Sequence, residues 1–323
     1  MRNMLAAVHE QYGPPEVVRL MEVPKPVPSK KQLLIRVAAT TVNRTDCGFR
    51  SAAYFISRFF SGLFKPKFKV LGCEFAGIVE EVGTEVSKFQ IGDKVVGYDD
   101  YRFGGHAAYI VKAEDVVTLA PSNLSLEQAA ALTEGAHYAL CNLRAAKVKQ
   151  GDKVLVNGGT GAIGSAAVQL AKYFGAEVTA VCHEQHQDLL LSLGADSAIA
   201  YNLHDFTAVE ECYDLVFDAV GKSSFDQCKS ILKDNGYYIS TELGKRAENV
   251  LLALASKFKK GKKVLFPIPS INQQDLVFLT RLAEAGKFKP LIGRIYPLEE
   301  IVQAYHYVES GQKIGNVVIR ILQ

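Results

Sequence analysis

A glycine-rich loop is the feature of this sequence whose spacing points most directly to chemistry. Gly159, Gly161 and Gly164 form a G-x-G-x-x-G pattern within VLVNGGTGAIGSAAVQLAK, between an apolar run typical of a strand and an alanine-rich run typical of a helix. We expect Gly159 to make the tight turn, Gly161 to admit a diphosphate to the backbone, and Gly164 to let helix and strand pack closely. The pattern therefore predicts a dinucleotide site.

The helix after this loop is expected to bind phosphate through its first turn. A helix N-terminus offers unpaired N–H groups and a partial positive charge. Thr160, Ala162 and Ile163 lie in this turn or directly before it. We expect these three residues to contact the diphosphate together with the glycines.

The end of the next strand is expected to decide between NADPH and NADH. Cys182 and His183 stand there, and neither is the carboxylate that would hold a ribose diol and repel a 2′-phosphate. Glu184 is suited to the diol, whereas His183, Gln185 and His186 are suited to the phosphate. We expect NADPH, with NADH as the alternative. The two histidines do not predict a metal site, because two ligands do not make one.

The composition excludes several classes of protein. The chain has 323 residues, 48% hydrophobic and 22% charged, which predicts two ordinary globular domains. A net charge of +3 is far from the concentrated basic face that nucleic-acid binding requires. Six cysteines without a CxxC pair predict neither a disulfide framework nor a closed zinc site. No run of about 18 apolar residues occurs, so we expect a cytoplasmic protein.

The elements that must position the loop alternate between strand and helix. Ser125 and Gln128 suit a capping box at the start of an alanine-rich helical run, which marks a domain boundary near residue 123. Apolar strands and helices then alternate, as in a doubly wound α/β domain with a parallel sheet. The expected strands are 153–157, 177–182, 214–220, 236–240 and 263–269, and the expected helices are 165–175, 186–195 and 224–232.

The first third of the chain is expected to be β-rich. Segments 33–40, 75–83 and 93–99 carry short β-branched runs separated by glycine and aspartate. After the basic run 257–263, a helix and a final helix-plus-strand follow, and we expect the last strand to return to the first domain. The predicted domains are 1–123 completed by 268–323, and 124–267.

Several ordered motifs resemble the medium-chain dehydrogenase/reductase family over essentially the whole chain. They are TVNRTDCG, LGCEFAGIVEEVG, GDKVVGY, FGGHAAY and the glycine loop. The resemblance implies a GroES-like β-rich catalytic domain and a Rossmann domain. Asn43 and Cys73 stand where zinc alcohol dehydrogenases of the family carry a cysteine and a histidine, and Ala131 and Leu132 offer no third ligand. The four-cysteine lobe is also absent, so the chain is similar to the zinc-free, zeta-crystallin-like quinone oxidoreductase branch.

That branch implies NADPH-dependent hydride transfer to a quinone or an α,β-unsaturated carbonyl. The resemblance implies a cleft that includes Asn43, Thr45, Asp46 and Tyr54, with Asn43 and Tyr54 as catalytic candidates. The alternatives are that Asn43 is a buried loop-fixing amide and that Tyr54 is a wall of the pocket. Asp46 is expected to anchor the loop, and Cys73 to fill space or line the pocket. The further cofactor contacts that it implies are Thr133, Tyr201, Ala219, Val220, Leu243 and Asn316.

Other functions remain open at this point. The chain is also compatible with a zinc-free alcohol dehydrogenase-like protein, or with a membrane-associated dinucleotide-binding protein that has little catalysis. Apolar residues in 55–68 recur at helical spacing beside lysines, which favours a lid over the substrate, with an anionic membrane surface as the alternative. We also expect a homodimer formed through an apolar edge strand at 263–267.

Overall fold

The computed structural model describes residues 2–52, 58–256, 260–270 and 272–321. The chain divides into two compact units, Met1–Glu134 with Ile271–Gln323, and Gly135–Ser270. These unit limits lie close to the domain limits expected at 123/124 and 267/268, which stay predictions.

Unit 1 is built on a seven-stranded sheet with the order β14-β15-β3-β4-β5-β7, in which β6 also pairs with β3. β14 and β15 are parallel, and the other pairs are antiparallel. A separate antiparallel ribbon joins β1 and β2. The strands are β1 Asn3–His9, β2 Val18–Pro24, β3 Gln32–Val42, β4 Glu74–Val82, β5 Lys94–Tyr98, β6 Tyr109–Ala113, β7 Val117–Leu119, β14 Ile292–Pro297 and β15 Asn316–Arg320.

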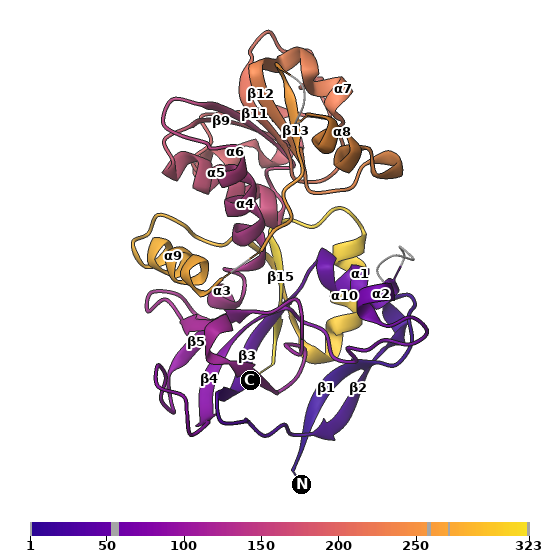
Figure 1. The fold of residues 1–323 in the computed structure, drawn as a ribbon, viewed down its shortest axis with the longest axis vertical. Coiled ribbons are helices and arrows are strands. Elements are labelled where there is room, and N and C mark those ends of the chain that lie inside the picture. The colour runs from indigo at the N-terminus through magenta and orange to yellow at the C-terminus, as the bar shows by residue number, and fades with distance from the viewer. Residues whose placement is uncertain (1, 53–57, 257–259, 271, 322–323) are drawn as a thin grey trace. The chain divides into compact units, whose positions relative to one another are not determined.

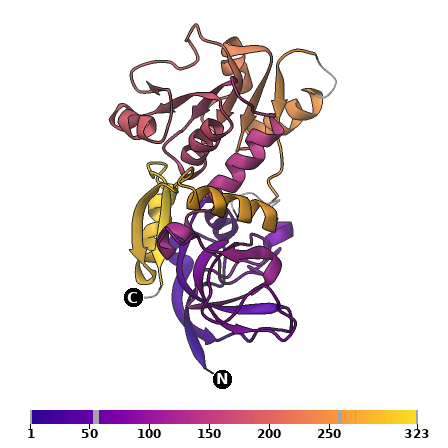
Figure 2. The ribbon, with the colours of Figure 1, turned by 90° about the vertical axis from the view of Figure 1, so that its left-hand side faces the viewer.

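The last strand completes the first unit, as the sequence predicts. β15 pairs antiparallel with β3, and Figure 2 shows this yellow segment beside the indigo strands from the start of the chain. Leu33, Ile35 and Phe75 are fully buried in the core of the sheet. The helices of unit 1 are α1 Arg44–Ser51, α2 Arg58–Ser61, α3 Leu126–Ala130, α9 Gln273–Glu284 and α10 Ile301–Glu309.

Unit 2 contains a six-stranded parallel sheet with the order β10-β9-β8-β11-β12-β13. Counted from its own first strand, this is the doubly wound order 3-2-1-4-5-6, so the predicted α/β fold class is confirmed. β10 was not predicted from the sequence. The strands are β8 Lys153–Asn157, β9 Glu177–Cys182, β10 Ser197–Ala200, β11 Tyr213–Asp218, β12 Leu232–Ser240 and β13 Lys263–Leu265.

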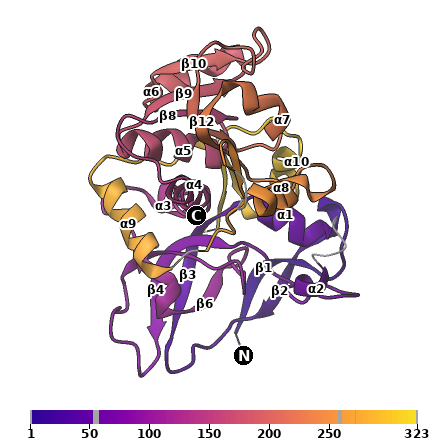
Figure 3. The same ribbon diagram turned by 45° about the horizontal axis from the view of Figure 1, so that its top comes forward.

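Helices cover the sheet of unit 2 (Figures 1 and 3). α5 packs against β8 and β9, α6 against β10, α7 against β12, and α8 against β13. α8 was not predicted from the sequence. The helices are α4 Glu134–Ala145, α5 Ala162–Tyr173, α6 Gln187–Ser192, α7 Phe225–Cys228 and α8 Glu248–Ser256.

The capping box expected before the second domain is present. The Ser125 side chain accepts from the Gln128 N–H, and the Gln128 side chain accepts from the Ser125 N–H. The expected single helix is instead two, because α3 ends at Ala130 and α4 begins at Glu134. This break frees Thr133 and Glu134 to hydrogen bond elsewhere in unit 1.

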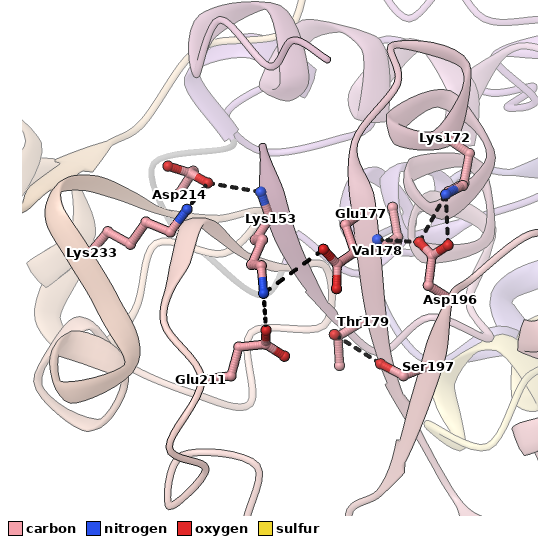
Figure 4. A network of polar contacts seen from close by, with 10 residues as sticks. All are labelled: Lys153, Lys172, Glu177, Val178, Thr179, Asp196, Ser197, Glu211, Asp214 and Lys233. Carbon is pink, nitrogen blue, oxygen red and sulfur yellow. Dashed lines mark hydrogen bonds and ion pairs between the residues drawn. The ribbon is translucent and has the colours of Figure 1, made fainter. Parts of the chain in front are cut away.

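Charged side chains form a polar network along the starts of the parallel strands (Figure 4). Lys153 pairs with Glu211 and with Glu177, whose carboxylate is 3.8 Å from Nζ, and its N–H donates to Asp214 at 2.8 Å. The Asp196 carboxylate accepts from the Val178 N–H at 2.7 Å and from Lys172 at 2.8 Å. These charges are paired at the amino ends of the strands, whereas the expected ligand site lies at the carboxyl ends.

Residues 55–68 are only partly described. Within the described part, α2 ends at Ser61, since Gly62 has a left-handed φ of 116°. Phe59 and Phe64 are exposed, while Phe68 packs on Phe103 with ring centroids 5.5 Å apart. Among residues 58–68, the helix therefore covers only Arg58–Ser61, and the apolar residues after it do not continue a helical face. No helix in the described ranges is long and apolar enough to cross a membrane.

The edge strand β13 leads to a prediction about assembly. Its position at the end of the sheet agrees with the sequence expectation. Leu251 and Leu254 of the neighbouring α8 are 63% and 53% exposed, so β13 and α8 together offer an apolar edge that a second copy would cover. We expect light scattering at micromolar concentration to report a dimer, and Leu251→Asp with Leu254→Asp to give a folded monomer. A monomeric native protein would contradict this.

Candidate functional site

The glycine loop lies at the point where the strand order of unit 2 reverses. It joins β8 to α5, and β8 pairs with β9 on one side and β11 on the other. Gly158 and Gly159 both donate their N–H groups to the Val181 carbonyl, at 3.2 and 3.0 Å. Gly158 has a φ of 81°, whereas Gly159 has no positive φ. The Gly161 N–H donates to the Gly158 carbonyl at 3.1 Å, so Gly159 is a central residue of the tight turn, as the sequence predicts, and the positive φ falls on Gly158 before it.

The other two glycines differ in what surrounds them. A Cβ at Gly164 would lie 2.1 Å from the Gly158 carbonyl oxygen, so this glycine is required for the close packing of helix and loop. A Cβ at Gly161 would have the Gly158 oxygen, 3.6 Å away, as its near neighbour. Gly161 caps α5 without a side-chain hydrogen bond. There is thus room at Gly161, at the N-terminus of α5, for a group that approaches the backbone, which fits a bound diphosphate.

The ends of β9 and β10 bring together residues that are distant in the sequence. The His183 and Tyr201 rings meet edge to face at 5.8 Å, and the Tyr201 N–H donates to the Cys182 carbonyl at 2.9 Å. His183 Nδ1 accepts from the Gln185 N–H at 3.4 Å. Tyr201 is 58% exposed. The carboxyl ends of β9 and β10 thus place the His183 imidazole beside the Tyr201 phenol, and neither residue is a carboxylate. β9 is also the strand whose Val181 carbonyl accepts from the glycine loop.

A buried carboxylate that the sequence reasoning missed shapes the loop after β11. Asp218 accepts from the Ser223 N–H at 2.9 Å, from the Val220 N–H at 3.3 Å and from Asn157 Nδ2 at 3.1 Å. Val220 lies against the glycine loop, since a Cβ at Gly158 would be 2.3 Å from its Cγ1. An aspartate that ends an apolar strand was the signal for this role.

The remaining cofactor candidates fall in both units. Ala219 follows β11 directly, and Leu243 lies after β12, 39% exposed, with its carbonyl accepting from the Asn249 N–H at 3.1 Å. Thr133 and Asn316 belong to unit 1. The Thr133 hydroxyl donates to Glu74 at 2.7 Å, and Asn316 Nδ2 donates to the Leu291 carbonyl at 3.0 Å. Their contacts with a cofactor stay predictions.

Asn43 is held by the loop that it caps. Its Oδ1 accepts from the Asp46 N–H at 3.0 Å, its Nδ2 donates to Cys73 Sγ at 3.0 Å, and its side chain is 2% exposed. The Asp46 carboxylate accepts from the Asn43 N–H at 3.1 Å and from the Gly72 N–H at 2.9 Å. These contacts are those of loop-fixing residues. Tyr54, the other catalytic candidate, lies outside the described residues.

A second group of buried carboxyls, which the sequence reasoning missed, adjoins this loop. Glu74 on β4 accepts from the Thr41 hydroxyl, the Thr133 hydroxyl and the Glu134 N–H. The Glu134 carboxyl accepts from the Thr45 hydroxyl at 2.8 Å. Glu74 and Glu134 are 0% and 5% exposed.

Burial disfavours the charged forms of these groups. It raises the pKa of the Glu134 carboxyl well above its usual range, and the neighbouring Glu74 and Asp46 carboxyls raise it further. Burial also raises the pKa of Glu74, although its three hydrogen bonds oppose this. It raises the pKa of Asp46 to about 7 and lowers the pKa of Lys313, a cation that interacts with Glu134 and Glu74.

The residues at the former catalytic zinc position do not fit zinc. A catalytic zinc is held by three protein ligands, whereas here the Cys73 thiol faces the Asn43 amide at 3.0 Å. Burial raises the pKa of this thiol well above its usual range, which opposes the thiolate form that zinc requires. Across the described ranges, no three His, Cys, Asp or Glu side chains form a group that suits a metal ion.

The fold and the loop define a dinucleotide-binding oxidoreductase, and comparison with known proteins agrees. Residues 29–124 match the alcohol dehydrogenase GroES-like domain and residues 193–319 the zinc-binding dehydrogenase family. The chain is 32% identical to a 2-methylene-furan-3-one reductase of Solanum lycopersicum, over 98% of this chain and 79% of the relative. It is 28% identical to an NADPH-dependent alkenal/one oxidoreductase of Arabidopsis thaliana, over 98% and 80%. The quinone oxidoreductase structure from Coxiella burnetii has a TM-score of 0.88 and 32% identity, covering 99% of this chain and 100% of that one.

The chain therefore belongs to the medium-chain dehydrogenase/reductase family, in its quinone oxidoreductase branch. It is an NAD(P)H-dependent oxidoreductase with a GroES-like unit and a Rossmann unit.

Proposed function

We propose that this protein reduces a quinone or an α,β-unsaturated carbonyl with NADPH, without zinc. The observation that carries the proposal is the open α5 N-terminus at Gly161, in a chain whose former zinc position holds Asn43 and Cys73. The first feature suits a dinucleotide and the second excludes the usual metal-assisted alcohol chemistry from the proposal.

The chemistry of the acceptor fits a site of this kind. Bound NADPH supplies the hydride. A conjugated acceptor takes it at an electrophilic carbon while its oxygen becomes an enolate or phenolate, which needs hydrogen-bond donors and a proton rather than a Lewis acid. Asn43 Nδ2 and the Thr45 hydroxyl, both at the start of α1, are the donors that we propose for the acceptor side. One N–H of the Asn43 amide donates to Cys73 and fixes the loop. The amide has a second N–H, and this is the one that we propose for the acceptor oxygen.

NADPH is proposed over NADH because of the end of β9. His183 and Tyr201 stand together there, and both can donate to a 2′-phosphate. The relative from Arabidopsis thaliana named for NADPH supports the same choice. Glu184, exposed in the next position, is the group that NADH would use instead.

Replacing His183 by aspartate tests this choice. The variant places a carboxylate next to the position that we propose for the 2′-phosphate, and the two negative charges repel each other. We expect kcat/KM for NADPH to fall by about tenfold relative to that for NADH, a difference of roughly 1.4 kcal/mol. His183→Asn is the uncharged control. An unchanged ratio in the aspartate variant would contradict the assignment.

The function itself is tested by turnover. The purified protein is assayed with NADPH or NADH against 1,4-benzoquinone and 2-hexenal, and with NADP+ or NAD+ against a simple alcohol. We expect NADPH-dependent reduction of one or both conjugated acceptors and no alcohol oxidation. A protein that binds NADPH and reduces neither acceptor would refute the proposal and favour a binding protein with little catalysis.

Zinc independence has its own expected result. We expect elemental analysis to find no stoichiometric zinc, and chelation to leave turnover unchanged, since one buried thiol beside an amide does not hold the metal. About one zinc per chain, lost together with activity on chelation, would overturn this.

A further inference from the structure

Thr45 and Glu134 join two parts of unit 1 that are 89 residues apart in the sequence. Thr45 is in the first turn of α1 and is partly exposed, whereas Glu134, the first residue of α4, is buried. Their hydrogen bond therefore connects an accessible hydroxyl to a carboxyl inside the unit. Neither the glycine motif nor the loop-fixing role of Asn43 requires such a pair.

The two buried glutamates have different environments. Glu74 accepts three hydrogen bonds, from the Thr41 and Thr133 hydroxyls and from the Glu134 N–H, and such bonds stabilise an ionised carboxylate. In the described part of the chain, the Glu134 carboxyl has the Thr45 hydroxyl as its hydrogen-bonding side chain. When two neighbouring carboxyls have different numbers of hydrogen-bond donors, the one with more donors is ionised and the other stays protonated.

The charges around the pair agree with this division. Glu74 on β4 and Asp46 on α1 both disfavour a negative charge on Glu134. Lys313, which precedes β15, interacts with both glutamates, and its single positive charge balances one negative charge. Arg44 on α1 disfavours the charged form of Lys313. A proton on Glu134 thus leaves Glu74, which has three hydrogen-bond donors, as the ionised member of the pair.

We propose that Glu134, acting through the Thr45 hydroxyl, supplies the proton that the reduced acceptor takes up. The inference rests on the proposed function. When the acceptor carbon has received the hydride, the Thr45 O–H bond breaks and its proton goes to the acceptor oxygen. For this transfer the Thr45 O–H turns from the Glu134 carboxyl to the acceptor oxygen, and the protonated Glu134 carboxyl donates to the Thr45 oxygen in its place. The Glu134 O–H bond then breaks and restores the Thr45 hydroxyl, and solvent returns a proton to the Glu134 carboxylate. An enone is thereby converted to its enol, which rearranges to the saturated carbonyl. In this scheme Thr45 is the catalytic residue and Glu134 is a positioning residue that acts through it.

The test uses the full-length protein, NADPH, and two acceptors of different basicity. Glu134→Gln keeps the shape and the hydrogen bond to Thr45 but removes the acid. We expect kcat for 2-hexenal to fall about 10²-fold, as for loss of a general acid, with NADPH affinity and the KM for hexenal unchanged. The fall with 1,4-benzoquinone is smaller, since a hydroquinone anion is a weaker base than a simple enolate. We expect kcat/KM of the native protein to fall at alkaline pH, because Glu134 loses its proton there. This fall should be absent from the Glu134→Gln variant.

Companion variants separate a proton path from a structural contact. Thr45→Val should reproduce the loss and Thr45→Ser should restore turnover, which also carries the test if Glu134→Gln does not fold. Glu127→Gln, which removes a surface carboxylate paired with Arg320, is the matched control and should behave as the native protein. A Glu134→Gln protein with native kcat and native pH profile overturns the inference, as does a loss of stability with an unchanged pH profile. A native protein that binds NADPH yet reduces neither acceptor instead overturns the proposed function.

Discussion

Replacing Gly161 by valine is expected to weaken NADPH binding by roughly 100-fold or more while unit 2 stays folded. The backbone of Gly161 is extended, with φ −73° and ψ 172°, which valine adopts readily. The nearest atom to an added Cβ is 3.6 Å away, so the apo fold has room for it. The side chain would instead enter the space proposed for the diphosphate, and overpacking of this kind costs about 3 kcal/mol. Calorimetry with NADPH measures the effect.

Gly164→Val is the contrasting variant. Its Cβ would lie 2.1 Å from the Gly158 carbonyl oxygen, so we expect unfolding or a large drop in Tm before any question of binding arises. The pair separates a glycine needed by the ligand from a glycine needed by the fold. Native NADPH affinity in Gly161→Val would refute the loop assignment.

Asp46 is expected to make the protein less stable as the pH rises. Burial raises its pKa from 3.8 to about 7, so the folded protein holds a proton that the unfolded chain has already released. The stabilisation is fully present below about pH 3.8 and is lost as the pH rises through about 7. The shift corresponds to on the order of 4 kcal/mol in the free energy of unfolding.

Asp46→Asn isolates this contribution from that of other carboxyls. Asparagine does not titrate, so the difference in unfolding free energy between native and variant protein should change by that amount between about pH 4 and pH 8, in favour of the variant at high pH. Urea unfolding at several pH values measures it. A difference that stays constant across this range would show that Asp46 is ionised in the folded protein.

The sequence predicted the elements of unit 2 closely where local signals are strong. β8 and β9 have the predicted bounds, because their apolar runs end at glycine, asparagine or histidine. β10 and α8 were missed, since Ser197–Ala200 is short and weakly apolar and α8 is preceded by no clear cap. The helical run predicted across residues 125–146 is broken at 131–133, because the Thr133 hydroxyl and the Glu134 N–H donate to Glu74 rather than to the helix.

By itself, the sequence determined the family and the doubly wound unit. It also predicted the dinucleotide role of the glycine loop and the loss of zinc ligands at Asn43 and Cys73, because each prediction depends on residue types at short, fixed spacings. Only the tertiary structure decided that the positive φ of the glycine loop falls on Gly158, that His183 meets Tyr201, and that Thr45 meets Glu134. Such contacts join residues far apart in the chain, here 89 positions for Thr45 and Glu134. The tertiary structure also decides the protonation of the buried carboxyls, since the pKa of a carboxyl depends on burial and neighbours that no local pattern encodes.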